Sequence, residues 1–282
     1  MRELLRTAAK SFDVICAGEA RWNVARSEAR SMRLRPGGGA VSAALALARR
    51  ELRVGLATTL SDDRPGRALL ERMKASAVDT GGVAFGEPES GLVFLERIGG
   101  ARQVVSYRER EEPIAIPEGW SSRVLLLSGL SPVVAHAGAL CKAARAARRA
   151  GTIVVLDVNA RWHLWAGRDA RTIRMVLREA DVVFCAVEDL FGLNMDAASM
   201  SAALRPNAIL AMSDGARAWA TGPFGEVVQR SDESLLGSGD AFAIAICAEL
   251  ARAESAPSGV ALWERALQRG REAARARLTA FD

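Results

Sequence analysis

Short apolar runs alternate with longer amphipathic segments along most of the 282-residue chain. Continuous apolar runs bounded by turn residues are typical of strands that are buried on both faces of a parallel sheet. The longer segments repeat their apolar residues with helical spacing, which predicts helices that cover the sheet. The alternation therefore predicts an α/β fold, in which a mainly parallel central sheet is flanked by helices.

The predicted strands share an uninterrupted apolar run and lie at 12–17, 54–58, 124–128, 153–157, 182–185 and 209–212. The predicted helices lie at 41–50, 67–76, 135–150, 170–179 and 200–204, with two more near the C-terminal end. We found no internal repeat and no low-complexity linker between these elements. The expectation is a single domain over residues 1–282.

One segment interrupts this alternation. Two strand-like runs, 92–98 and 102–107, are separated by Gly99 and Gly100. Paired glycines supply the positive φ that tight hairpin turns require. Because no helical pattern adjoins them, we expect a hairpin at about 91–109 that lies outside the main sheet, where it could cover a site or contact another copy of the chain.

Charge and composition exclude several classes of function. The chain has 38 Lys and Arg against 33 Asp and Glu, for a net charge of +5, with no long basic run. This pattern does not favour a nucleic-acid partner. The only lysines are Lys10, Lys74 and Lys142, and none follows a glycine. A Walker A phosphate loop is therefore excluded, because that loop requires a Gly-Lys pair.

The four cysteines are far apart in the sequence and each has apolar neighbours, so we expect buried, reduced thiols. With only two histidines, the chain cannot form a multi-histidine metal centre. No apolar stretch is long enough to span a bilayer, and residues 1–10 lack the apolar core of a signal peptide. The expected location is the cytoplasm, with no membrane partner.

The most informative motif is Gly-Ser-Gly-Asp at 237–240, which precedes an apolar helical run. Glycines allow the backbone to approach a ligand closely, and free N–H groups at a helix start favour an anion. An Asp at this point could accept a proton from an attacking hydroxyl while the amides stabilise negative charge. The alternative is an ordinary turn with an N-cap, since Ser and Asp are preferred there.

This motif, taken with two segments nearer the N-terminus, is similar to the ribokinase-like (PfkB) carbohydrate kinases. The family's glycine turn is matched by Gly-Gly-Gly-Ala at 37–40, and its Gly-Asp-Asp-x-x-Gly segment by Ser-Asp-Asp-Arg-Pro-Gly at 61–66. The order of motifs agrees over nearly the whole chain. The resemblance implies a ribokinase-like fold, ATP and Mg²⁺ as cofactors, and a hairpin that acts as a lid and can pair two copies into a homodimer.

A third segment narrows the substrate. Residues 157–165 read Asp-x-Asn-x-Arg-x-x-Leu-Trp, and Tyr107 and Arg108 follow the hairpin. Both features resemble 2-keto-3-deoxygluconate kinases. The resemblance implies ATP-dependent phosphorylation of a primary hydroxyl on a sugar or sugar acid. An Arg suits a carboxylate substrate because its planar fork binds both oxygens, although Arg161 could equally form a structural ion pair.

The resemblance also assigns roles to individual positions. The catalytic residues would be Asp240 as base, with Gly237, Ser238 and Gly239 as the anion hole. The substrate-binding residues would be Asn23, Gly38, Gly39, Ser42, Tyr107, Arg108, Asn159 and Arg161. The nucleotide-binding residues would be Ser213, Gly215, Gly225 and Gly239, and the metal-binding residue would be Glu188.

Several positions depart from the family pattern. Asn23 replaces an Asp, Ser42 and Cys185 replace Asn, and Ser-Leu-Leu at 234–236 replaces Asp-Thr-Thr, which removes polar groups linked to monovalent-cation binding. Two interpretations remain open: an active kinase with altered substrate choice, or a pseudokinase that senses a sugar or nucleotide. A dinucleotide-binding oxidoreductase is disfavoured, because the glycines at 37–39 do not complete the Rossmann fingerprint.

Overall fold

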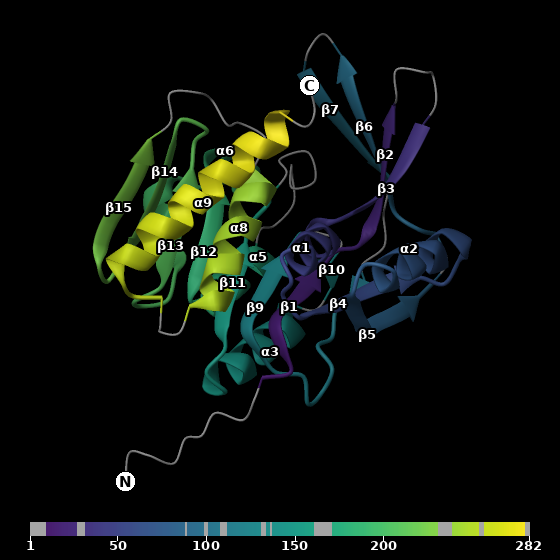
Figure 1. The fold of residues 1–282 in the computed structure, drawn as a ribbon, viewed down its shortest axis with the longest axis horizontal. Coiled ribbons are helices and arrows are strands. Elements are labelled where there is room, and N and C mark those ends of the chain that lie inside the picture. Colours follow the sequence, from purple (N-terminus) through teal and green to yellow (C-terminus); the bar gives the residue numbers. More distant parts are fainter. Residues whose placement is uncertain are drawn as a thin grey trace.

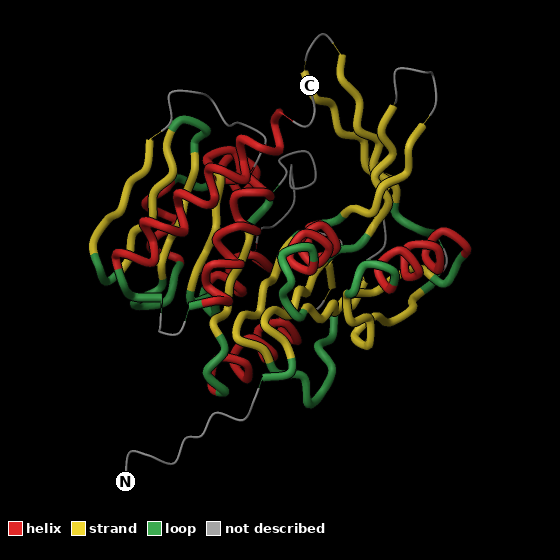
Figure 2. The backbone as a smooth tube through the Cα atoms, in the orientation of Figure 1, coloured by secondary structure: helices red, strands yellow, loops and turns green. Residues whose placement is uncertain are grey.

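The predicted apolar runs form the centre of the molecule. The computed structural model describes residues 10–26, 32–87, 89–98, 101–107, 112–130, 134–135, 137–160, 171–230, 239–253 and 257–279. Among these residues, nine strands form one sheet (Figures 1 and 2). Their order is β15 (Gly225–Arg230), β14 (Arg217–Gly222), β13 (Ile209–Ser213), β12 (Val182–Ala186), β11 (Ile153–Asp157), β9 (Ser122–Ser128), β1 (Phe12–Gly18), β4 (Val54–Ser61) and β5 (Val78–Gly86).

The sheet is parallel except at one end, where β14 and β15 pair antiparallel. The predicted mainly parallel sheet is therefore confirmed. Its inner strands are almost wholly buried, since every residue of β4 lies in the interior. Continuous burial explains why these strands are mostly apolar, with no regular alternation of polar and apolar side chains.

Helices cover both faces of the sheet. On one face the core includes side chains from α1 (Gly39–Ala48), α2 (Arg64–Lys74), α8 (Gly239–Arg252) and α9 (Val260–Thr279). On the other it includes side chains from α3 (Ala137–Arg149), α5 (Arg171–Leu177), α6 (Val187–Leu193) and α7 (Ala197–Ala203). Two hydrophobic cores result, one on each side of the sheet.

A second, smaller sheet stands apart from these layers, at the top right of Figure 1. Its order is β3 (Met32–Gly37), β2 (Arg21–Arg26), β6 (Leu92–Ile98) and β7 (Ala101–Tyr107), and we call it the small sheet. The antiparallel pair β6 and β7 corresponds to the hairpin expected from the sequence. The expected hairpin comprised only β6 and β7, whereas β2 and β3 extend the sheet to four strands. A short parallel pair, β8 (Glu112–Pro113) and β10 (Val134–Ala135), lies beside β4 of the main sheet, where Thr59 donates to the Pro113 carbonyl.

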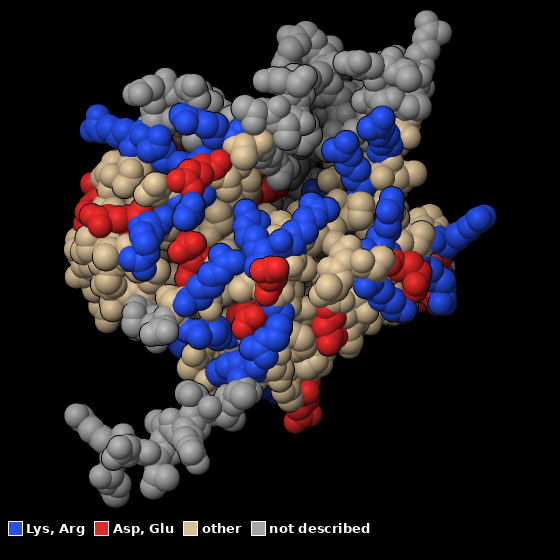
Figure 3. Space-filling view, in the orientation of Figure 1, with Lys and Arg blue, Asp and Glu red and all other residues tan. Residues whose placement is uncertain are grey.

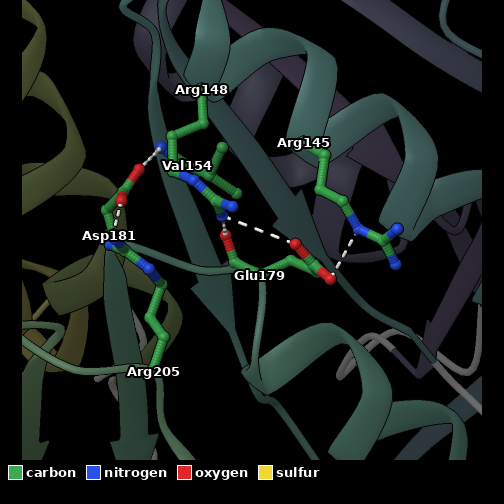
Figure 4. Close-up of polar contacts among 6 residues, drawn as sticks. All are labelled: Arg145, Arg148, Val154, Glu179, Asp181 and Arg205. Carbon is green, nitrogen blue, oxygen red and sulfur yellow. Dashed lines mark hydrogen bonds and ion pairs between the residues drawn. The ribbon is translucent and has the colours of Figure 1, made fainter.

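Charged side chains stabilise the edge of the main sheet at which β11 and β12 begin (Figure 4). Asp181 accepts a hydrogen bond from Val154 N at 2.9 Å and pairs with Arg205 at 2.6 Å. Glu179 pairs with Arg145 at 2.8 Å. Burial raises the pKa of Asp181, although the hydrogen bond from Val154 and the charge of Arg205 oppose the rise. The network connects α3 with the turns before β12 and β13, at the edge of the sheet opposite to Glu188 and Ser213.

The four cysteines are buried and unpaired, as expected. On the face drawn in Figure 3, Lys and Arg side chains are interspersed with Asp and Glu. No helix in the described ranges combines the length and apolarity needed to cross a bilayer.

Candidate active site

The chain changes direction across the sheet between β1 and β9. From β1 the sheet continues through β4 and β5 on one side, and through β9, β11, β12 and β13 on the other. In open α/β sheets, a crevice forms outside the carboxyl ends of the strands at such a switch point, and ligands bind there. This switch point is therefore the place where the predicted site residues would be expected to meet.

Three consecutive glycines allow α1 to begin against this switch point. A Cβ on Gly38 would lie 2.2 Å from the carbonyl oxygen of Glu19, and one on Gly39 would lie 2.4 Å from Ser128 Oγ. Gly38 also has a φ of 89°, in the region that favours glycine. A Cβ on Gly37 would lie 2.4 Å from the side chain of Asn23. The glycine run thus packs against β1, β9 and β2 together.

A buried ion pair holds the chain where it leaves β1 for β2. Arg21 Nη1 lies 2.6 Å from Glu19 Oε2, and both side chains are only 5% exposed. Loss of one partner from such a pair leaves an uncompensated buried charge, which is costly. The pair therefore fixes the backbone of Glu19 beside Gly38 and the start of the small sheet beside the switch point.

Polar contacts continue along this edge to the next strands. Ser128 Oγ, at the end of β9, donates a hydrogen bond to Asp157 Oδ2 at 2.7 Å. Two residues after Asp157, Asn159 Nδ2 donates to Asp240 Oδ1 at 3.3 Å. Asp240 lies in the first turn of α8, where the free N–H groups of the helix favour its negative charge. The structure therefore brings Asn159 and Asp240 into direct contact.

Two further carboxylates follow β12 at this edge of the sheet. Glu188 and Asp189 lie in the first turn of α6, directly after β12. Burial raises the pKa of Asp189 to about 7, and the charges of Asp240 and Glu188 add to the rise, whereas hydrogen bonds from the Ala186 and Ala160 amides oppose it. Glu188 is exposed. In the part of the chain that the structure describes, no three metal-ligating side chains are already grouped as a metal site.

The predicted nucleotide residues are divided between two edges of the sheet. Ser213 ends β13 at the same edge as Glu188, and Gly215 follows in a turn with a φ of 87°. Asp214 closes this turn by accepting from Arg217 N at 2.7 Å. Gly225, however, pairs with Gly222, which lies against Ile209 at the start of β13. A strand length, about 15 Å, therefore separates Gly225 from Ser213.

Ser42 lies in the first turn of α1 and its amide donates to the Gly38 carbonyl, so it adjoins the glycine run. Cys185, which stands where the family has Asn, is buried, and burial raises the pKa of its thiol well above the usual range. Tyr107 ends β7, and only its backbone is described. Gly237, Ser238, Arg108 and Arg161 lie outside the described residues.

Sequence reasoning missed two members of this edge. Ser128 connects Gly39 to Asp157, and Asp189 connects the turn after β11 to the start of α6. The signal for Ser128 was its place at the end of an apolar strand, before a glycine. The signal for Asp189 was its position next to Glu188.

Comparisons with known proteins indicate a family of carbohydrate kinases. The model of a family described as pfkB family carbohydrate kinase matches residues 1–281. A 5-dehydro-2-deoxygluconokinase of Shouchella clausii is 30% identical over 187 residues, which is 60% of this chain and 57% of that protein. One from Clostridium perfringens is 26% identical over 176 residues, which is 58% of this chain and 52% of that protein. The matched segments thus span little more than half of these relatives.

Solved structures share the fold at low sequence identity. The fructokinase of Xylella fastidiosa with bound ATP has a TM-score of 0.71 at 22% identity, covering 93% of this chain and 90% of that one. The apo fructokinase of Vibrio cholerae O395 has a TM-score of 0.77 at 18% identity, covering 95% of this chain and 99% of that one.

Proposed function

The chain belongs to the pfkB family of carbohydrate kinases, and on this premise we propose that it transfers the γ-phosphoryl group of ATP to a primary hydroxyl of a sugar or sugar acid. The main support is the contact between Asp240 and Asn159 at the switch-point edge that also holds Gly38 and Gly39. A carboxylate at a helix start, at the sheet edge that also holds a glycine turn, combines a base with a place for an anion.

In the proposed reaction, Asp240 accepts the proton of the substrate hydroxyl. The hydroxyl oxygen forms a bond to the γ-phosphorus, the bond between that phosphorus and the bridging oxygen breaks, and ADP leaves with the electron pair. The amides of Gly237, Ser238 and Gly239 would stabilise the charge on the transferring group. Catalysis of such transfers is mainly positioning and electrostatic stabilisation.

The family implies Mg²⁺, and the residues of this edge fit it. Mg²⁺ prefers oxygen ligands and retains several waters. Glu188 offers an exposed carboxylate. The charges of Asp240 and Glu188 add to the rise that burial causes in the pKa of Asp189, and a divalent cation would neutralise such negative charges. When bound, the ion would neutralise charge on the phosphates, and Glu188 would hold it through its carboxylate. Ser213 and Gly215, at the end of the adjacent strand, would contact the nucleotide.

The substrate would lie between the glycine run and the small sheet. Asn23 lies against Gly37 and the Ser42 amide donates to the Gly38 carbonyl, which supports this location. Asn23, Gly38, Gly39 and Ser42 would line the site, and Tyr107, Arg108 and Arg161 would complete the wall. The relatives are named for a deoxy keto sugar acid, which supports a substrate with a carboxylate, such as 5-dehydro-2-deoxygluconate or 2-keto-3-deoxygluconate. A guanidinium would bind that carboxylate through two parallel hydrogen bonds.

The proposal extends to the organisation of the whole protein. Residues 1–282 would form one kinase domain in which the small sheet acts as a lid over the substrate. The outer strand of the small sheet, β3, exposes Met32 (59%) and Leu34 (54%), which supports pairing of two copies through the lid. Exposed apolar side chains on an edge strand favour association.

A coupled ADP-release assay tests the proposed reaction. With ATP and Mg²⁺, we expect turnover of 5-dehydro-2-deoxygluconate or 2-keto-3-deoxygluconate to exceed that of fructose and ribose. Asp240→Asn should lower kcat by about 10²–10⁴-fold, because the base is lost. Asp196→Asn, a carboxylate that caps α7, is the matched control and should retain wild-type turnover. Equal turnover by wild type and Asp240→Asn would overturn the assignment of the base; ligand binding without ADP release would favour a sensor.

A further inference from the structure

The turn after β11 connects two functional elements that are distant in sequence. Asn159 is half-buried and has a φ of 40°, a left-handed conformation that Asn adopts more readily than most residues. Its side chain donates to Asp240, which is 81 residues further along the chain. The turn thus spans the gap between the sheet and the first turn of α8.

The backbone on either side of Asn159 is held by β12 and α6. Val158 N donates to the Phe184 carbonyl at 2.9 Å. The Ala160 amide donates to the Asp189 carboxylate, which also accepts from Ala186 N at 2.9 Å. With both neighbours fixed in this way, the Asn159 side chain has a defined direction toward α8.

We propose that Asn159 is a positioning residue that orients the Asp240 carboxylate, and that it acts through Asp240 without binding the sugar. This inference rests on the proposed kinase function and replaces the substrate-binding role that family resemblance implied for Asn159. The amide donates to Oδ1 of Asp240, and this hydrogen bond restricts rotation of the carboxylate that is to accept the substrate proton. Because a small displacement of a catalytic base lowers the rate of proton transfer, a hydrogen bond that fixes the carboxylate favours catalysis.

Two variants distinguish the effect of the Asn159 side chain from that of its backbone conformation. Asn159→Gly retains access to the left-handed conformation and removes the whole side chain, including the donor to Asp240. Asn159→Asp is isosteric but places a second carboxylate against Asp240, so that both cannot readily be ionised together. Asn207→Gly is the matched control, because Asn207 also has a positive φ, 64°, and lies in an exposed turn before β13, at the opposite edge of the sheet.

Steady-state kinetics give the first readout. We expect Asn159→Gly to lower kcat by about 10- to 100-fold while KM for the sugar and for ATP stays within about two-fold, as for a group that acts only on the transition state. Asn159→Asp should lower kcat and move the acidic limb of its pH profile to higher pH. Asn207→Gly should match wild type. A rise in KM with unchanged kcat, or no change in either variant, overturns the inference.

A second readout does not depend on turnover. In protein labelled with carbon-13 aspartate, the Asp240 carboxyl resonance is assigned by its absence from Asp240→Asn. We expect this resonance to titrate at a pH higher by about one unit or more in Asn159→Asp than in wild type. Superimposable titrations overturn the inference. If the wild type releases no ADP with any sugar, the proposed function fails, whereas this titration still shows whether the side chain at position 159 contacts Asp240.

Discussion

Glycines at the switch point show how a single methyl group can decide the geometry of the site. Gly39 begins α1 where a Cβ would lie 2.4 Å from Ser128 Oγ and 2.6 Å from Gly129 N. The second of these atoms is backbone and cannot move aside as a flexible side chain can. Only a residue without a side chain therefore allows α1 to begin this close to β9.

Gly39→Ala should push α1 away from β9. We expect a loss of about 1–3 kcal/mol in the free energy of unfolding, the usual cost of overpacking, and a higher KM for the sugar. Urea denaturation and the ADP-release assay measure the two effects. Gly138→Ala is the matched control: Gly138 lies in α3 with no atom within 4 Å of its Cβ position, so Ala should stabilise the chain by about 0.5–1 kcal/mol. Equal stabilities of the two variants would contradict this account.

Some site residues were visible in the sequence and others were not. Glycine runs and an Asp before an apolar helix are local signals, so Gly38, Gly39 and Asp240 could be identified without a structure. The contact between Asn159 and Asp240 could not, because it depends on the order of strands and on the packing of α8 across the sheet. Gly225 was assigned to the nucleotide site by resemblance alone, and the turn between β14 and β15 places it at the opposite edge of the main sheet.

At the scale of elements, the small sheet is attached to the main body through the first turn of α2. Trp22 Nε1, on β2, donates to the Pro65 carbonyl at 2.9 Å. Asp63 caps α2 by accepting from Gly66 N at 2.8 Å, and also accepts from Glu89 N at 3.0 Å and Ser90 N at 2.7 Å. The same carboxylate thus fixes a helix start and the segment that enters β6.

Asp63→Asn should loosen this attachment, because an amide cannot accept all of these hydrogen bonds. We expect a loss of about 1–3 kcal/mol in the free energy of unfolding at pH 7 and a higher KM for the sugar, measured by urea denaturation and ADP release. Asp62→Asn is the matched control, since Asp62 is exposed and its carboxylate pairs with the exposed Arg67. It should change stability by less than about 1 kcal/mol.

The pH dependence of this effect has a defined sign. Burial raises the pKa of Asp63, but hydrogen bonds from Ser90, Gly66 and Glu89 outweigh it and hold the pKa below the ordinary value of 3.8. The stabilisation is therefore complete above the pKa of the unfolded chain and is lost as the pH falls through the lower pKa of the folded chain. The difference between wild type and Asp63→Asn should shrink below about pH 4. A difference that stays constant to pH 2.5 would contradict this assignment.

Elements were predicted best where burial is complete. All six predicted strands are present with boundaries close to those expected, because a strand buried on both faces is apolar throughout. Strands β2 and β3 were missed because each has only six residues and neither forms an uninterrupted apolar run. Their partners are one another and β6, so the pairing is not visible in either segment alone.

At the scale of the whole molecule, the two sheets differ in how their faces are covered. Helices bury both faces of the main sheet, and its strand order sets the switch point. In the small sheet, Leu34 pairs across from Val24, and Val24 from Phe94, so apolar side chains share one face. Fold class followed from the sequence, whereas the extent of the small sheet required the structure.

This apolar face predicts that two copies of the chain pair through β3. Met32 and Leu34 are exposed and lie two residues apart, on one face of an edge strand, and a symmetric dimer would bury both pairs. Sedimentation velocity at micromolar concentration should show a dimer for wild type and a monomer for Leu34→Lys. Val228→Lys is the matched control, since Val228 is exposed (41%) on β15, the edge of the main sheet, and this variant should remain dimeric. A wild type that stays monomeric at all concentrations would rule out the pairing, and a dimer unaffected by Leu34→Lys would place the interface elsewhere.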